Sequence, residues 1–245
     1  MGFQVNTSDK GGATNLDGTI ASQVKASPEN GFSIVSYDYP ASGSFTVGHG
    51  LNSAPAVIIY KNRNRATNWF VYHSAATSKD QYIILNGNSG VASGSNFWGT
   101  SAPTNAVFGS TVDVTGISTD EAIAYCFTPV AGHSAMGKYT GNQNASGPFV
   151  YTGFKVSWLM VKRSDGGGSG YDWFIWDDQR DLFNAVTQDL RANNYIEETV
   201  TTRCDFLSNG FKIRGANLDF NASNGVYVWM AFASNPFASN GGLAR

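Results

Sequence analysis

Hydrophobic and polar positions along this chain follow the two-residue period of β-strands. In residues 69–73, Trp69 and Val71 fall on one face while Phe70 and Tyr72 fall on the other. A related block at residues 172–178 repeats this alternation. Both faces of these blocks are apolar, so the pattern predicts strands that are covered on both sides.

Two shorter blocks, residues 56–60 and 158–161, are continuous apolar runs bounded by turn residues. Their length favours buried strands over helices. The composition agrees, because aromatic residues make up 13% of the 245-residue chain and charged residues only 14%, with 28 glycines for turns. The sequence therefore predicts an all-β fold.

One segment departs from this pattern. Leu182, Val186 and Leu190 are spaced four apart, as on one face of a helix. The chain contains an internal repeat, however, and the equivalent segment of its other copy holds the strand-like residues 82–85. We therefore predict a strand at residues 188–193 and a candidate short helix before it.

Four blocks recur in the same order in the two halves of the chain. Such self-similarity at a fixed spacing is typical of a duplicated structural unit. The anchor pairs, with their offsets, are Tyr37 and Tyr139 (102), Lys61 and Lys162 (101), Trp69 and Trp173 (104), and Phe127 and Phe232 (105). The chain is therefore predicted to be two diverged tandem copies of one unit.

The repeat predicts the domain organisation. Residues 31–130 form the first β-sandwich repeat, and residues 131–245 form the second. Residues 1–30 are polar and rich in glycine, with one candidate strand at residues 18–24. We interpret them as an N-terminal arm or linker that docks on the first copy or on a neighbouring molecule.

Charge and hydropathy exclude several classes of function. The net charge is −2, with no basic face, which argues against a nucleic-acid partner. The basic run at Lys61, Arg63 and Arg65 is interpreted as a solvated turn. No apolar stretch approaches the ~18 residues of a membrane span, and no signal peptide is visible. Cys126 and Cys204 are interpreted as buried thiols.

The residues that could support catalysis are few. His49, His73 and His133 are interpreted as structural, since no strained serine turn accompanies them. Paired carboxylates could serve glycoside cleavage, and Asp177, Asp178 and Asp181 form the best such group, with turn capping as the preferred alternative. We predict no enzyme activity, no catalytic residue, no metal ligand and no cofactor, although a calcium ion stays possible.

Two aromatic residues in loop-like contexts are candidate binding residues. Flat rings stack on the apolar faces of sugars, while amide and carboxylate groups bind the hydroxyls. The candidates are Trp98 and Tyr171, with packing at the edge of a sandwich as the preferred interpretation of both.

Several strings together resemble a family of tailed-bacteriophage virion proteins. The most specific are GFSIVSY, VGHGL and KNR in the first copy and YVWMAFASNPF near the end, and the resemblance covers nearly the whole chain. Similar proteins are tail fibre, tail spike or other virion structural proteins. The resemblance implies jelly-roll or concanavalin-like sandwich domains, and supplies no catalytic site.

The function that this resemblance implies is a structural component of the virion. We expect a tail fibre or appendage that assembles with other virion proteins, forms a homo-oligomer such as a trimer, and contacts host-surface carbohydrate. It would be made in the host cytoplasm without a signal peptide and would insert in no membrane. The alternatives are a capsid, neck or head-fibre decoration protein and, less favoured, a polysaccharide-degrading tail spike.

Overall fold

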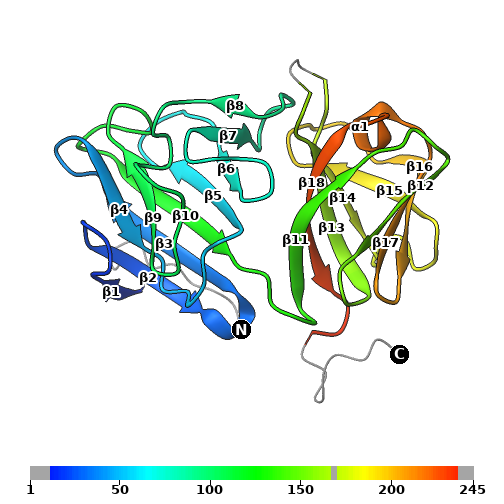
Figure 1. The fold of residues 1–245 in the computed structure, drawn as a ribbon, viewed down its shortest axis with the longest axis horizontal. Coiled ribbons are helices and arrows are strands. Elements are labelled where there is room, and N and C mark those ends of the chain that lie inside the picture. Colours follow the sequence, from blue (N-terminus) through cyan, green and yellow to red (C-terminus); the bar gives the residue numbers. More distant parts are fainter. Residues whose placement is uncertain (1–11, 167–169, 237–245) are drawn as a thin grey trace. The chain divides into compact units, whose positions relative to one another are not determined.

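The computed structural model describes residues 12–166 and 170–236, and β-strands dominate them (Figure 1). The all-β prediction is thus confirmed. The chain divides into two compact units. The first unit runs through Tyr82 and resumes at Ala92–Thr128, whereas the second takes Ile83–Val91 together with the chain from Pro129 onward.

The first unit contains an eight-stranded sheet, in the order β1-β2-β3-β10-β5-β6-β7-β8, and a two-stranded sheet, β4-β9, although the last two residues of β7, Ile83 and Ile84, fall in the second unit. Its strands are β1 (Ala13–Asn15), β2 (Ser22–Ser27), β3 (Phe32–Asp38), β4 (Ser44–Gly48), β5 (Val57–Asn62), β6 (Phe70–His73), β7 (Gln81–Ile84), β8 (Ala92–Ser93), β9 (Val107–Thr111) and β10 (Glu121–Phe127).

The second unit contains one eight-stranded sheet, in the order β11-β18-β13-β14-β15-β16-β17-β12. This sheet folds over, so that its end strands β11 and β12 approach each other. Its strands are β11 (Ser134–Thr140), β12 (Ser146–Tyr151), β13 (Val156–Arg163), β14 (Phe174–Asp177), β15 (Val186–Arg191), β16 (Thr199–Leu207), β17 (Gly210–Arg214) and β18 (Val226–Ala233).

Equivalent strands of the two units pair in the same register. Tyr37 pairs with Ala122 between β3 and β10, and Tyr139 pairs with Tyr227 between β11 and β18. The other anchors behave in the same way, because Lys61 pairs with Ile123, and Lys162 pairs with Val228. Because register follows the pattern of buried side chains, shared anchors lead to shared pairing.

The N-terminal segment lies on the first copy, one of the two positions expected for it, and takes part in the sheet there. Residues 13–27 contribute β1 and β2 to the sheet of the first unit, and the candidate strand at residues 18–24 corresponds to β2 at Ser22–Ser27. Gly12 allows a close approach, since a Cβ there would lie 2.6 Å from the Val24 backbone. The segment is therefore part of the first unit's sheet, while residues 1–11 of the predicted arm lie outside the described residues.

The segment with helical spacing forms a strand. A strand is confirmed here, but β15 spans Val186–Arg191 and so begins and ends two residues before the predicted 188–193; the candidate short helix before it is wrong. Val186 is buried, but Leu182 and Leu190 are exposed, so the three residues do not form one apolar face.

The helices of the described residues are the 3₁₀ helix Pro28–Asn30 and α1 (Leu218–Asn221). None of the helices in this part of the chain is long and apolar enough to cross a membrane.

Each unit has its own aromatic core. In the first, Tyr37 contacts Phe45 and Phe108 edge-on, with ring centroids 5.9 and 6.0 Å apart. In the second, Phe174 and Trp176 both pack edge-on against Phe220 of α1, at 5.8 and 5.9 Å. Burial of these large rings contributes to the hydrophobic stabilisation of each unit.

Candidate functional site

The two aromatic residues proposed from sequence differ in their exposure to solvent. Trp98 is only 2% exposed, and its indole N–H donates to the Gln81 carbonyl at 2.8 Å, so its expected surface position is wrong. Tyr171 is half-buried, and the Arg163 guanidinium lies 4.4 Å from the centre of its ring. The preferred interpretation, packing within the fold, describes Trp98.

The acidic group at residues 177–181 is held by local contacts. Asp177 accepts the backbone N–H groups of Gln179 and Arg180, which is the expected turn capping. Its pKa is lowered, because these contacts and the Arg180 side chain outweigh the opposing effect of burial. Asp178 accepts a hydrogen bond from Ser157 at 2.7 Å, and Asp181 accepts the Thr187 N–H at 2.7 Å.

Two of the histidines are fully integrated into the first unit. His49 accepts the Leu51 N–H at Nδ1 and pairs through Nε2 with the Thr104 carbonyl at 3.1 Å. Burial lowers the pKa of His49. His73 is buried and accepts the Ala75 N–H at 3.3 Å. These contacts match the structural role expected for both.

The remaining candidates from sequence are also buried or dispersed. His133 is half-buried, beside the ring of Phe232, and burial lowers its pKa. Cys126 and Cys204 are buried free thiols, as expected, and burial raises the pKa of Cys126 to about 12. Among residues 12–166 and 170–236, no three His, Cys, Asp or Glu side chains converge as a metal-binding group would.

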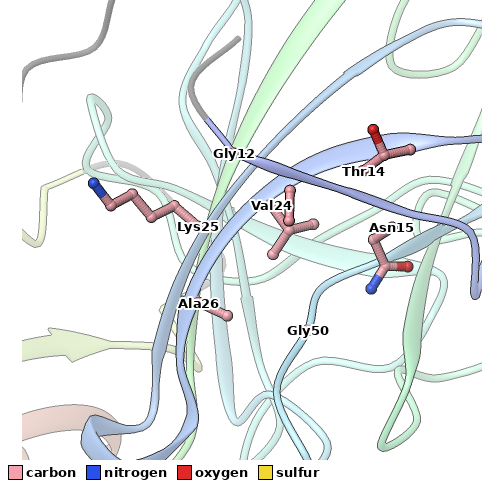
Figure 2. A pocket seen from close by; sticks show the side chains of 8 residues that line it. Gly12, Thr14, Asn15, Val24, Lys25, Ala26 and Gly50 are labelled. Atoms are coloured by element: carbon pink, nitrogen blue, oxygen red, sulfur yellow. The ribbon is translucent and has the colours of Figure 1, made fainter.

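A shallow hollow of about 650 Å³ lies over β1 and β2 in the first unit (Figure 2). Its polar side chains already serve the local structure. Thr14 accepts a hydrogen bond from Gln23 at 3.0 Å, and Asn15 donates to Asp17 at 3.0 Å. Figure 2 shows Lys25 pointing away from Thr14 and Asn15, so these polar groups do not converge on one ligand position.

The hairpin formed by β15 and β16 in the second unit presents apolar side chains to solvent. Tyr195, in its connecting loop, is fully exposed, and Ile196 beside it is about half exposed. Leu190 and Val200 lie on the outward face of the two strands. Burial of such surface is favourable, so exposed apolar groups gathered on one hairpin mark a candidate interaction site.

A network of ion pairs holds the base of this hairpin. Asp189 of β15 is buried, accepts the Thr199 N–H at 3.2 Å, and pairs with Arg203 of β16 at 3.3 Å. At the end of β15, Arg191 pairs with Asp172, which lies just before β14, at 2.5 Å. A separate ion pair joins Arg180 to Glu198 in the connecting loop at 3.0 Å.

Aromatic rings and an amide complete the support. The guanidinium groups of Arg191 and Arg203 lie 4.8 and 5.7 Å from the centre of the Phe174 ring. The Asn193 side chain accepts a hydrogen bond from the backbone N–H of Trp173 at 2.8 Å and donates one to Asp172 at 2.7 Å. The loop that carries Tyr195 is thus attached to the core at both ends, which limits the conformational entropy that binding would cost.

The charges beneath the hairpin shift one another's pKa values. Burial would raise the pKa of Asp172, but hydrogen bonds from Asn193 and Arg191 hold it below its usual range. Burial raises the pKa of Asp219 on α1. Burial also lowers the pKa of Lys162 to about 8, although Asp172 and Asp219 oppose the shift.

Sequence reasoning did not identify this site. Tyr195 stands in the string ANNYIEE, where two asparagines before it and two glutamates after it indicate a solvent-exposed turn. The second copy is also longer here than the first. The hairpin of β7 and β8 has strands of four and two residues, whereas β15 and β16 have six and nine.

Fold and site together define an all-β protein with a repeated unit and an aromatic hairpin on the second copy. The chain belongs to the family described as Domain of unknown function (DUF7483), which matches residues 6–236. No curated protein and no solved structure matches the chain.

Proposed function

We propose that this protein is a structural component of a tailed-phage virion, most specifically a tail-fibre or appendage module that assembles with other virion proteins. The support is the resemblance of GFSIVSY, VGHGL, KNR and YVWMAFASNPF to that family, together with the duplicated all-β architecture. The same resemblance supports assignment of the units as jelly-roll or concanavalin-like sandwiches and assembly as a homo-oligomer, such as a trimer.

The proposed host contact is non-catalytic binding of surface polysaccharide by the β15–β16 hairpin. The observation that carries this step is the full exposure of Tyr195 on a hairpin whose base is held by buried ion pairs. A phenol ring stacks on the apolar face of a sugar, and the neighbouring Asn194 and Glu197 can bind its hydroxyls. This hairpin replaces Trp98 and Tyr171 as the candidate sugar-binding surface.

The test of the virion assignment is electron cryo-microscopy of whole particles, with this chain located by its density and its copies counted. Few copies on a tail or fibre are expected. Many copies on the shell would instead favour the capsid or neck decoration alternative and would contradict a tail appendage.

The test of the binding site is adsorption of the purified chain to polysaccharide from the host surface. Tyr195→Ser is expected to weaken adsorption about tenfold, because a central aromatic contact is lost. Tyr151→Ser is the matched control, since Tyr151 is also an exposed tyrosine of the second unit but lies on β12. Equal adsorption of both variants and the wild type would contradict the site, and shortening of the polysaccharide would favour the degrading-spike alternative.

A further inference from the structure

In the first unit, β2 covers the outer edge of β3. The two strands pair antiparallel, with Gln23 opposite Ser36, Val24 opposite Val35, and Lys25 opposite Ile34. The segment before β2 continues across to the second sheet, where the Ile20 N–H donates to the Thr46 carbonyl at 3.3 Å. One side of the first unit is therefore closed by a strand from outside the repeat.

In the second unit, the strand equivalent to β3 is β11. The bounds of β3 and β11 agree at an offset of 102 residues, and the residues that pair with them in β10 and β18 agree at an offset of 105. Ile34, Val35 and Ser36 therefore correspond to Met136, Gly137 and Lys138.

Within the described residues, β11 is the end strand of its sheet, with β18 as its paired neighbour. The chain before it cannot provide a covering strand, because β10 ends at Phe127 and a tight turn joins Val130 to Ser134. The first unit has a covering strand because residues 12–30 precede its repeat, whereas no strand among residues 12–166 and 170–236 pairs with this edge of the second unit.

The hydrogen-bonding groups at this edge can be assigned. The His133 carbonyl accepts from Ala233 beyond the end of β18, whereas Ser134 bonds to Val130 on the opposite side. Successive residues of a strand direct their N–H and C=O groups to opposite sides. Met136 and Lys138 therefore direct theirs to the open edge, as Ile34 and Ser36 direct theirs to β2.

The neighbouring strand β12 differs from β4 in a way that indicates an apolar occupant. Val47 pairs with Phe108 in β4, and Val150 pairs with Phe211 in β12, which fixes the equivalence. In the first unit, Thr46 of β4 accepts a hydrogen bond from the Thr19 N–H of the N-terminal segment. The equivalent residue of β12 is Phe149, which is about half exposed.

We propose that the second unit binds an extended strand of another protein, which pairs antiparallel with β11 and packs against Phe149. Addition of a strand to a sheet edge gains backbone hydrogen bonds, and alternate side chains give specificity. The strand should carry a carboxylate opposite the exposed Lys138, where β2 has Gln23, and an apolar side chain opposite Gly137. The inference rests on the repeat and is independent of the virion assignment.

Charge favours a different protein over a second copy of this chain. Two β11 strands paired about Gly137 would place both Lys138 side chains on one face of the joined sheet. Like charges in such cross-strand positions are destabilising, and an edge lysine discourages self-pairing. A strand with a carboxylate at that place gains an opposite-charge pair instead.

The test uses the full chain and a peptide based on β2. The probe is the sequence of residues 17–27 with Gln23→Glu and Lys25→Ile, and the readout is hydrogen exchange. Saturating peptide is expected to slow exchange at the Met136 and Lys138 amides, while Ile34 and Ser36, already paired with β2, do not change. The matched control is the same peptide with Lys25→Pro, which lacks the N–H that pairs with Met136.

Exchanging the charges at Lys138 and at peptide position 23 then tests the register of the peptide on β11. Lys138→Glu is expected to weaken binding of the peptide about threefold, and a second peptide with Gln23→Lys is expected to restore it. Absence of protection in β11, or protection without the charge dependence, would overturn the proposal. Protection of β11 that rises with protein concentration in the absence of peptide would also overturn it, in favour of a second copy.

Discussion

At the scale of single residues, the repeat preserves a lysine that supports the loop following its strand. Lys61 donates to the Arg65 and Thr67 carbonyls at 3.1 and 2.6 Å. Lys162 donates to the Asn88 carbonyl at 3.0 Å and to the Tyr171 carbonyl. Lys61 is partly exposed whereas Lys162 is fully buried, so only Lys162 loses the whole hydration of its charge.

The lowered pKa of Lys162 predicts a stability that depends on pH. Between pH 8 and the ordinary lysine value of 10.5, the unfolded chain holds the proton that the folded chain releases, so this residue's contribution to stability rises with pH. Relative to Lys162→Met, the wild type should gain about 2 kcal/mol between pH 7 and pH 9.5. Urea unfolding of both proteins at each pH measures this difference.

The same substitution at the equivalent position provides the control for lost hydrogen bonds. At pH 7, Lys61→Met should cost no more than about 1 kcal/mol, because water can reach the carbonyls of Arg65 and Thr67. A gap between the wild type and Lys162→Met that stays constant from pH 7 to pH 9.5 would contradict the assignment of Lys162.

At the scale of elements, the β15–β16 hairpin depends on one buried carboxylate. Asp189→Ala should destabilise the protein by about 3–5 kcal/mol, because Arg203 would be left buried without its partner. Asp178→Ala removes a half-buried carboxylate of the same unit, and should cost only about 1 kcal/mol. Urea unfolding followed by tryptophan fluorescence measures both, and equal costs would argue against a special role for Asp189.

The elements themselves could be predicted to a large extent from sequence, because strand period and repeat offset are properties of side chains. The blocks around Lys61 and Trp69 became β5 and β6, and the repeat outweighed the helical spacing at Leu182. The candidate site could not be predicted in the same way. Trp98 has a loop-like context, yet its ring packs edge-on against Tyr72 and Phe97 in the core, where a backbone carbonyl accepts its N–H.

At the scale of the whole molecule, the repeat boundary and the compact units do not coincide. Ile83–Val91 precedes the second copy in sequence but belongs to the second unit. Its contacts are largely made by the backbone. The Ile84 carbonyl accepts the Trp173 indole N–H at 2.8 Å, and the Val91 N–H donates to the Ser164 carbonyl at 2.9 Å. Backbone groups are the same in every residue, so no sequence pattern could indicate this assignment.

This assignment predicts that a fragment cut at the repeat boundary is incomplete. A chain of residues 129–236 lacks the carbonyl partners of Trp173 and Lys162, and each lost hydrogen bond costs about 1 kcal/mol. Restoring Ile83–Val91 through a long flexible linker should therefore raise the melting temperature by about 10 °C. The control is the same linker with a scrambled segment. Equal melting temperatures for the native and scrambled segments would mean that Ile83–Val91 does not stabilise the second unit.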